Sequence, residues 1–313
     1  MSNILYVSCH SSLEWDEIRL LSKLGHQVFS CGTYFNPLLP TESLRTSVQL
    51  CQNKDWKNIF EKTKCKLLQN GSWYFSKEFI SLFDSIIFMH SYQSIISNMR
   101  ILSGKKIFWR TIGQSNFSIE KMVSKYKSDI KIIRYSEKES ETKGFCGQDY
   151  LIRFYKDKRD YLERNKQNDK ICCFYNSFHE RSSFFNREFY DKKISKKDHA
   201  IFGRNNVTDI FKGEVSFEKQ KEILSAWGAN YIINTRPANY TLSFVEGLAS
   251  GIPIIMDGED DCDERLSLLG SEIFKSTDMS EQTISKKIEL QNICYDKYFS
   301  FKEIAKQWNS IGL

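Results

Sequence analysis

A carboxylate stands inside an apolar helical pattern in the second half of the sequence. Glu246 lies in Thr241–Ser250, where Leu242, Val245 and Leu248 recur at the spacing of one helix face. No packing role explains a carboxylate at this place, so Glu246 is a candidate ligand-binding residue. The start of the same helix would carry free N–H groups and about half a positive charge, which suits a phosphate group.

Two histidines follow apolar runs that predict buried strands. His10 comes just after Asn3–Ser8, and His90 comes at the end of Ile86–Met89. Together with Asp16, they are candidates for a general base that takes the proton of an acceptor hydroxyl. For both histidines, a structural role beside the strand end is the alternative.

A polar loop with one glycine follows a third apolar run, Lys105–Trp109. In this loop Gln114 and Ser115 could bind sugar hydroxyls, and Arg110 could bind an anionic acceptor or a phosphate. The alternative is a loop that only caps the helix predicted for 118–126.

The elements around Glu246 predict a strand, a helix and a second strand. Tyr231–Asn234 forms the first strand, and Thr235–Tyr240 is a loop that contains a proline. Gly251 ends the helix, and Ile252–Met256 forms the next buried strand. Short connections of this kind make a right-handed unit of a parallel sheet, which directs the helix N-terminus at the crevice beyond the strand ends.

The rest of the chain alternates in the same way, which predicts an α/β protein with parallel sheets. The apolar patterns predict further strands at 26–32, 130–135, 171–175 and 199–202, and helices at 15–24, 217–227 and 300–313. No GxGxxG pattern follows the first strand, so the dinucleotide-binding fingerprint is absent from it.

One stretch of the sequence resembles a known family. Over Ala229–Gly258, the order strand, loop, small or hydroxyl residues, ValGlu, GlyLeuAlaSerGlyIlePro and strand is similar to the donor-binding segment of GT-B-fold glycosyltransferases. The nearest likeness is to the large retaining glycosyltransferase family four. Asp84, an apolar run and His90 also match that family, and the likeness is most specific over Phe211–Met256. An ordinary strand–helix–strand unit of another doubly wound protein is the alternative.

This resemblance implies two Rossmann-like domains whose parallel sheets face a central cleft. The expected parts are an acceptor-side domain over 1–160, a nucleotide-sugar-binding domain over 161–295, and a helix in 296–313 that packs back on the first domain. The length of 313 residues agrees with two domains of about 150 residues each.

The resemblance assigns the helix around Glu246 to the donor. Backbone N–H groups of Thr241 and Leu242 would hold the diphosphate, and Glu246 would bind the ribose hydroxyls. The family has a further glutamate eight positions earlier that touches the sugar, and here Ala238 stands in its place. Replacing Glu246 by alanine is expected to weaken donor binding and to leave the fold intact.

Four more residues receive expected roles from the resemblance. Arg181 and Arg204 would neutralise the diphosphate, the backbone near Val215 would meet the base, and His90 would position the donor sugar. No cofactor is expected beside the nucleotide sugar itself, for which a UDP-sugar is the expected choice.

No metal is expected either. The sequence Asp261–Asp263 is similar to the DxD metal motif of the other glycosyltransferase fold. Its place beyond the donor helix favours a solvated acidic loop, because a DxD motif would follow a strand upstream of the acceptor region.

Composition is that of a soluble globular protein, with 41% hydrophobic and 27% charged residues. No apolar run reaches the roughly 20 residues of a membrane span, and no signal-peptide pattern opens the sequence, so a cytoplasmic protein without integral membrane contact is expected. The nine scattered cysteines predict free thiols. The lysines of Lys156–Lys170 and Lys192–Lys197 are expected to be solvated.

The acceptor stays open at this point. A net charge of +6 allows an anionic partner, so one hypothesis is a hydroxymethylated pyrimidine of duplex DNA, as in viral DNA-base glycosyltransferases of this fold. A cell-envelope polysaccharide or lipid-linked glycan is the second hypothesis. The third is a binding module without catalysis, which the alanine at position 238 favours. The family's chemistry would retain the anomeric configuration, and the sequence carries no signal of oligomeric state.

Overall fold

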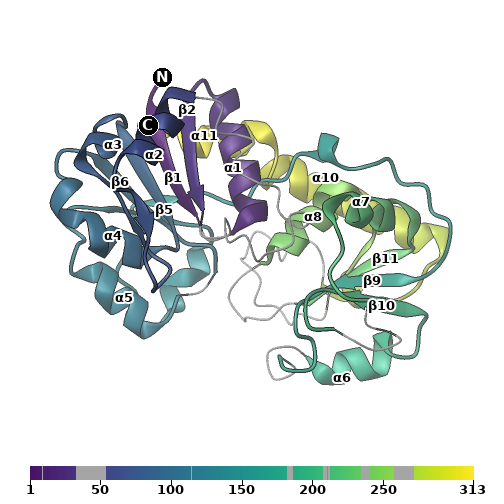
Figure 1. Ribbon diagram of the computed structural model, residues 1–313. Helices are drawn as coiled ribbons and strands as arrows, with labels where there is room; N and C mark the ends of the chain where they lie inside the picture. Colours follow the sequence, from purple (N-terminus) through teal and green to yellow (C-terminus); the bar gives the residue numbers. More distant parts are fainter. Residues whose placement is uncertain are drawn as a thin grey trace. The chain divides into compact units, whose positions relative to one another are not determined.

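The protein divides into two compact units, which are described here separately. The computed structural model describes residues 1–8, 10–32, 54–113, 115–181, 186–206, 210, 212–233, 240–256 and 271–313. Unit 1 consists of Met1–Arg153 and Phe301–Leu313, and unit 2 of Phe154–Ser300 (Figure 1). The sequence placed the changes of domain after residues 160 and 295.

Unit 1 is built on a sheet of parallel strands in the order β2-β1-β5-β6-β7-β8. These are β1 (Asn3–Ser8), β2 (Gln27–Gly32), β5 (Ser85–Met89), β6 (Lys106–Arg110), β7 (Lys131–Arg134) and β8 (Tyr150–Leu151). The helices of this unit are α1 (Ser11–Lys23), α2 (Lys54–Lys62), α3 (Lys77–Ser81), α4 (Tyr92–Asn98), α5 (Phe117–Ser124) and α11 (Phe301–Asn309). A short antiparallel pair, β3 (Lys66–Leu67) and β4 (Trp73–Tyr74), completes it.

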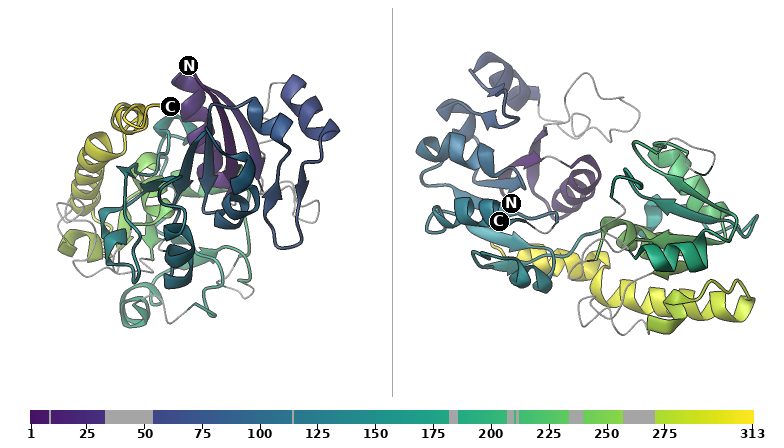
Figure 2. Two further views of the ribbon diagram at one scale, coloured as in Figure 1. Left: turned by 90° about the vertical axis from the view of Figure 1, so that its left-hand side faces the viewer. Right: turned by 90° about the horizontal axis from the view of Figure 1, so that it is seen from below.

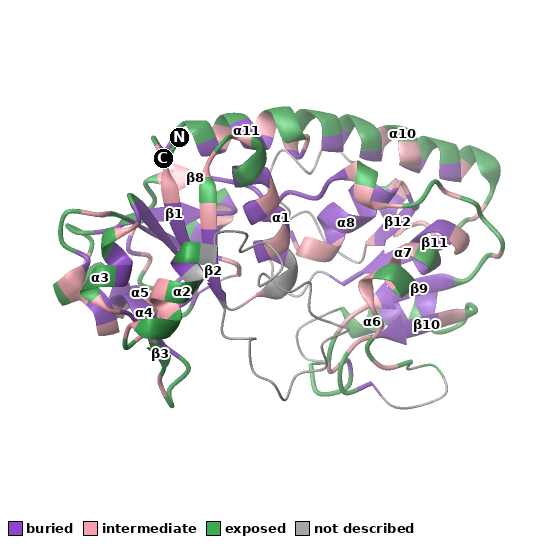
Figure 3. Ribbon diagram, turned by 45° about the horizontal axis from the view of Figure 1, so that its top comes forward, coloured by how far each residue is buried: buried purple, intermediate pink, exposed green. Residues whose placement is uncertain are grey.

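The central strands are continuous apolar runs because helices cover both faces of a parallel sheet. In β1, Ile4, Leu5, Tyr6 and Val7 are all fully buried, and β5 is buried along its whole length. Figure 2 shows β1 and β2 side by side in purple, and Figure 3 shows the buried strands between more exposed helices.

The strand order of unit 1 reverses beside β1. The chain goes from β1 outward to β2 and then returns to β5 on the other side of β1. At such a switch point, the connections at the carboxyl ends of two neighbouring strands leave in opposite directions and open a crevice for ligands. The residues that follow β1, β5 and β6 therefore share one edge of the sheet.

The last helix, α11, belongs to unit 1. Ile304 and Trp308 of α11 are buried, and the Lys23 ammonium of α1 lies 5.8 Å from the ring centroid of Phe301. The Gln307 side chain accepts a hydrogen bond from the backbone N–H of Arg153 at 2.8 Å. The C-terminal helix thus packs in the same unit as the N-terminal strand.

Unit 2 contains a second parallel sheet, in the order β10-β9-β11-β12. Its strands are β9 (Ile171–Phe174), β10 (His199–Phe202), β11 (Ala229–Ile232) and β12 (Ile254–Met256). Its helices are α6 (Arg187–Phe189), which continues into the π-helical turn η7 (Tyr190–Ile194), α7 (Phe217–Ala226), α8 (Leu242–Ser250), α9 (Ser271–Lys275) and α10 (Glu281–Tyr298). Over the residues that the structure describes, the 3-10 turns are η3 (Met99–Ile101), η4 (Glu137–Glu141) and η5 (Lys158–Asp160).

Alternate residues of the unit 2 strands supply two cores. Cys173 and Tyr231 pack with Tyr190 on the face of α6 and η7, and Cys172 packs with Ile223 on the face of α7. Figure 1 shows α7 and α8 on one side of this sheet and α6 on the other. The fold is therefore mixed α/β with parallel sheets in two Rossmann-like units, as the sequence predicted.

Side chains of α10 satisfy the backbone of β12, the last described strand in this order. Gln291 accepts a hydrogen bond from the N–H of Ile254 at 2.9 Å and donates one to the carbonyl of Ile252 at 2.8 Å. The Lys287 ammonium donates to the carbonyls of Ile254 at 3.1 Å and Ser276 at 2.6 Å. These bonds replace a neighbouring strand, which is one way to protect a sheet edge.

The burial of Lys287 predicts the direction in which the stability of the protein changes with pH. It is 2% exposed, and this burial lowers its pKa from 10.5 to about 8. Between these values the unfolded chain holds a proton that the folded chain has lost, so raising the pH favours folding. We expect the unfolding free energy of the wild type, minus that of Lys287→Met, to rise by about 2 kcal/mol from pH 8 to pH 10. Urea denaturation at both pH values measures this difference between the two proteins. A difference that is the same at pH 8 and at pH 10 would contradict the lowered pKa of Lys287.

Among the described residues, no helix combines the length and the apolar composition needed to cross a bilayer.

Candidate functional site

Helix α8 has well-defined ends. The Thr241 hydroxyl caps it by accepting a hydrogen bond from the N–H of Phe244 at 3.2 Å, and Gly251 ends it in the left-handed conformation with φ of 70°. A Cβ at Gly247 would lie 2.9 Å from the Ile254 side chain, so the helix lies close against β12. Such an N-terminus presents backbone N–H groups that the helix itself does not use.

The Glu246 carboxylate is held by one ion pair and one hydrogen bond from other segments. Its Oε1 lies 2.9 Å from the Lys156 ammonium, and its Oε2 accepts a hydrogen bond from the Gln220 amide of α7 at 3.0 Å. Glu246 is 8% exposed, and Lys156 is 1% exposed. The structure thus places Glu246 in an almost buried ion pair, as the fifth residue of α8.

The segment that carries Lys156 is itself fixed within unit 2. The Lys156 carbonyl accepts a hydrogen bond from the Tyr295 hydroxyl of α10 at 2.6 Å, and the N–H of Phe154 donates to the Tyr240 hydroxyl at 3.0 Å. The expectation of a solvated lysine stretch is therefore wrong for Lys156. The two residues Phe154 and Tyr155, shortly before it in the chain, are buried as well.

Two loops at the carboxyl edge of this sheet are joined by hydrogen bonds. Ser177, after β9, and Asn205, after β10, both have positive φ angles, of 53° and 63°. The Asn205 amide donates to the Ser177 hydroxyl at 3.0 Å, and the N–H of Arg204 donates to the Asn176 side chain at 2.8 Å. Left-handed backbone in residues other than glycine carries a strain that is common at functional sites.

The predicted diphosphate-binding arginines lie on these two loops. The guanidinium of Arg181 is 5.7 Å from the ring centroid of Tyr175, and that of Arg204 is 3.6 Å from a carboxylate oxygen of Glu214. Val215, predicted to lie near the base, is partly buried against the core under α7. Thr241 and Leu242 are partly exposed, whereas position 238 lies outside the described residues.

In unit 1, both candidate histidines lie at the carboxyl edge beside the switch point. His10 is the N-cap of α1, where its Nδ1 accepts from the N–H of Leu13 at 3.4 Å. His90 follows β5 with a φ of 56°, and its N–H donates to the carbonyl of Arg110 at 2.8 Å. Both are partly exposed, whereas Asp16 is buried within α1. Burial disfavours Asp16 as a base for an acceptor, because a base needs hydrogen-bond reach to its substrate.

A hollow of about 430 Å³ opens beside His90. The starts of α4 and α5 line it, with Tyr92, Gln93, Asn116, Phe117, Ser118 and Ile119. The Phe117 ring is exposed, and the other lining groups include two amides and a hydroxyl. An aromatic ring among neutral hydrogen-bonding groups suits an uncharged polar ligand.

Arg110 is part of a buried cluster. Its Nε and Nη2 donate to Glu17 Oε1 of α1 at 3.0 and 2.7 Å, and the Tyr6 hydroxyl donates to the other oxygen of Glu17. Burial and the Glu17 carboxylate raise the pKa of Tyr6 well above its usual value. This geometry favours a structural role for Arg110 over the predicted contact with an anion. Gln114 lies outside the described residues.

A second buried cluster surrounds Arg134 of β7. Its guanidinium donates to both oxygens of Glu120 of α5, at 2.8 and 2.9 Å, and lies 3.5 Å from a carboxylate oxygen of Glu139. Burial alone would raise the pKa of Glu120, but hydrogen bonds from Arg134 and others override it and lower the pKa to about 2. Ser115 donates to the same carboxylate, so its hydroxyl is part of this cluster rather than of an open sugar site.

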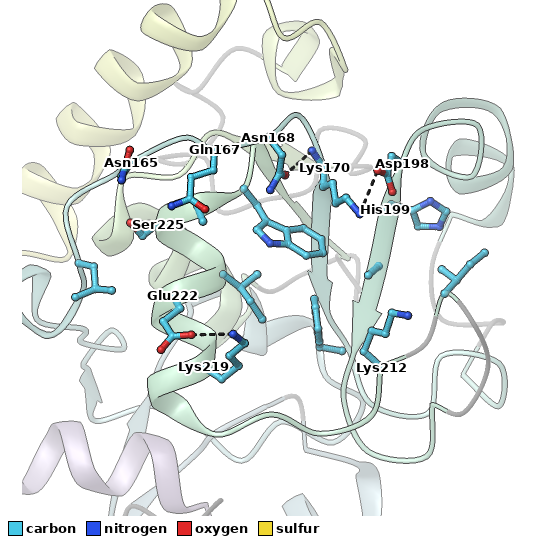
Figure 4. Close-up of a pocket in the computed structure, with 17 residues that line it drawn as sticks. Asn165, Gln167, Asn168, Lys170, Asp198, His199, Lys212, Lys219, Glu222 and Ser225 are labelled. Atoms are coloured by element: carbon cyan, nitrogen blue, oxygen red, sulfur yellow. Dashed lines mark hydrogen bonds and ion pairs between the residues drawn. The ribbon is translucent and has the colours of Figure 1, made fainter.

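A groove of about 990 Å³ runs along α7 on unit 2 (Figure 4). Trp227 and Phe202 line it, and the Lys156–Glu246 pair does not. Several of its charged groups pair with each other, such as Lys219 with Glu222 at 2.8 Å, as the dashed lines show. The groove is therefore separate from the Lys156–Glu246 pair at α8.

Within the described ranges, no three His, Cys, Asp or Glu side chains gather in a way that would suit a metal ion. The acidic run Asp261–Asp263 lies outside these ranges.

Comparisons with known proteins identify the fold of this chain. No protein-family model matches the sequence, and no curated protein matches it. The structure is similar to that of HepE from Anabaena in complex with UDP-glucose, with a TM-score of 0.65, 9% identity and 99% of both chains covered. It is similar to a glycosyltransferase from Rickettsia africae, with a TM-score of 0.62, 11% identity and 99% and 97% of the two chains covered. An O-GlcNAc transferase of Thermobaculum terrenum follows, with a TM-score of 0.58, 8% identity, 99% of this chain and 66% of that chain.

The fold of the chain is thus the GT-B fold of glycosyltransferases, as predicted. At sequence identities this low, the similarity establishes only the fold. One fold can host many functions, so the function has to be argued from the residues of the site. Membership of the retaining family four stays a prediction.

Proposed function

We propose that this protein is a glycosyltransferase that moves a sugar from a nucleotide-sugar donor to a hydroxyl acceptor. The observation that carries the proposal is Glu246, an almost buried carboxylate held in place in the middle of the helix that follows β11. Two proteins of the same fold, HepE solved with UDP-glucose and the Rickettsia glycosyltransferase, support the reaction class.

The donor nucleotide would bind at the carboxyl edge of the unit 2 sheet. The free N–H groups of Thr241 and Leu242 would meet the diphosphate at the positive end of α8. Arg181 and Arg204 would approach it from the loops after β9 and β10. Glu246 would accept hydrogen bonds from the ribose, and the backbone near Val215 would meet the base. A UDP-sugar is the proposed donor.

In the reaction, the bond between the anomeric carbon and the diphosphate oxygen breaks, and a bond from the acceptor oxygen to that carbon forms. Negative charge grows on the leaving diphosphate, where preorganised N–H groups stabilise it better than water does. With retention of configuration, the leaving phosphate takes the acceptor proton. With inversion, His90 or His10 would take it, because both are partly exposed at one sheet edge.

The acceptor is proposed to bind in the hollow beside His90. Phe117 offers a face for a sugar ring or a base, and the amides of Gln93 and Asn116 can bind hydroxyls. A hydroxymethylated base of duplex DNA and a cell-envelope glycan are the two acceptors to be separated by experiment.

A thermal-shift series tests this proposal. Ligands that bind only the folded protein raise its melting temperature by mass action. We expect UDP and UDP-glucose to raise it, and GDP, ADP, CMP and dTDP to raise it less. Absence of any nucleotide effect at millimolar concentration would contradict the proposal. A further rise with duplex DNA that carries hydroxymethylcytosine, lost at high salt, would identify DNA as the acceptor.

A further inference from the structure

The groove along α7 is a feature of unit 2 that the proposed reaction does not use (Figure 4). Residues of α7 line one part of it, and residues of β10 and of the segment before β9 line the rest. Its volume of about 990 Å³ lies at the upper end of the roughly 300–1,000 Å³ of small-molecule sites. The groove therefore has room for a ligand larger than a single sugar ring.

Trp227, the residue directly after α7, gives the groove an aromatic surface. Its ring is partly exposed and meets the ring of Phe202 edge to face, with the centroids 5.5 Å apart. Within the part of the chain that the structure describes, the indole N–H of Trp227 has no hydrogen-bond partner. Such a ring can pack against the C–H groups of a sugar while its N–H donates to a hydroxyl.

Two amide side chains lie on the segment before β9, at one end of the groove (Figure 4). The backbone there is fixed to the end of α7, because the N–H groups of Asn165 and Gln167 donate to the carbonyls of Ser225 and Ala226, both at 2.9 Å. The two amide side chains are exposed and have no partner among the described residues. An amide donates and accepts at once, which matches a sugar hydroxyl.

Most charges of the groove are neutralised within it. Lys170 pairs with Asp198 at 3.3 Å, and Lys219 pairs with Glu222 at 2.8 Å. Among the described lining residues, Lys212 is the lysine without an ion pair. A nucleic acid would need an excess of cations along its phosphates, so this balance favours an uncharged ligand.

His199 also lines the groove, but both of its ring nitrogens are used inside the protein. Its Nδ1 lies 2.8 Å from the carbonyl of Lys197, to which it donates, and its Nε2 lies 2.9 Å from the Tyr190 hydroxyl. This histidine is therefore held as a structural group and does not offer a base to a ligand. The groove is suited to binding rather than to catalysis.

We propose that the groove along α7 binds a chain of uncharged sugars, at a site separate from those of the proposed donor and acceptor. One sugar ring packs on Trp227, and hydroxyls of the chain bind the amides of Gln167 and Asn165. The inference goes beyond the proposed function and does not depend on it, because none of these residues belongs to the proposed reaction.

A titration followed by nuclear magnetic resonance tests this inference. The probes are maltohexaose, cellohexaose and chitohexaose, with glucose as the short comparison. The readout is the indole N–H signal of Trp227, which is assigned by its loss in Trp227→Ala, and affinities are measured calorimetrically. Gln167→Ala and Asn165→Ala change exposed side chains, and Gln282→Ala is the matched control, because it removes an exposed amide of α10 that does not line the groove.

We expect at least one hexasaccharide to shift the Trp227 signal and to bind more tightly than glucose. The affinity should fall about tenfold in Trp227→Ala and about threefold in Gln167→Ala and in Asn165→Ala. It should persist in Gln282→Ala.

Three results would overturn the inference. The first is that no hexasaccharide shifts the Trp227 signal at millimolar concentration. The second is an unchanged affinity in Trp227→Ala, or in Gln167→Ala if Trp227→Ala does not fold. The third is an affinity that falls in Phe117→Ala but not in Trp227→Ala, which would place the oligosaccharide in the hollow beside His90. Because nucleotides are absent from this titration, each of these results leaves the proposed donor site untouched.

Discussion

Replacing Glu246 by alanine is expected to lower the free energy of unfolding by about 3 kcal/mol or more, and to abolish donor binding. The change leaves the Lys156 ammonium buried without its carboxylate. This differs from the sequence-based expectation of an intact fold, because the sequence did not reveal the lysine. Urea denaturation followed by circular dichroism measures the loss.

A double variant separates stability from binding. Glu246→Gln combined with Lys156→Met removes both charges while keeping the approximate side-chain volumes. Replacing a whole buried ion pair is often neutral for stability, so we expect most of the lost free energy to return. Donor binding should not return. If Glu246→Ala is as stable as the wild type, this result contradicts the buried position of the Lys156 ammonium beside Glu246.

Replacing Arg134 by methionine is expected to destabilise unit 1 by about 3–5 kcal/mol at neutral pH. Both side chains of the Arg134–Glu120 pair are 0% exposed, and Glu139 lies beside them. Without the guanidinium, two buried carboxylates face each other. Lys131→Met is the control on the same strand, because its ion pair with Asp149 is 59% exposed on the lysine side and should contribute less than about 1 kcal/mol.

The pH dependence of this loss has a definite sign. In the wild type the pKa of Glu120 is held at about 2, below its unfolded value of 4.5. This stabilisation is present above pH 4.5 and is lost as the pH falls toward 2. In Arg134→Met the carboxylates can take up protons, so the difference between variant and wild type should shrink on acidification. A difference that stays constant from pH 7 to pH 4 would contradict this account of the cluster.

Much of the fold was predictable from the sequence because buried parallel strands are apolar runs. The predicted strands Asn3–Ser8 and His199–Phe202 agree with β1 and β10 residue for residue. The strand before α8 was predicted about two residues late, since β11 begins at Ala229. Its second residue, Asn230, is polar yet buried, and the Cys172 thiol donates to its side chain. A polar side chain with an internal partner conceals the start of a strand.

The site was less predictable, for a physical reason. Glu246 stood out because it interrupts a helical pattern, which is local information. Its partner Lys156 lies far away in the sequence, in a stretch whose many charges indicated solvent. Arg110 is likewise paired with Glu17 across a large separation, so its loop position suggested a ligand where the structure has an internal carboxylate. The order of the strands in the sheets decides which charged side chains are buried together. The spacing of these residues along the sequence does not reveal it.

The assignment of Glu246 to the donor site is tested most directly by one calorimetric titration. UDP is titrated into the wild type and into the Glu246→Gln/Lys156→Met double variant, after urea denaturation has shown that the two are of similar stability. We predict measurable UDP binding by the wild type and at least about tenfold weaker binding by the double variant. Equal affinities in the two proteins would contradict the donor site at α8.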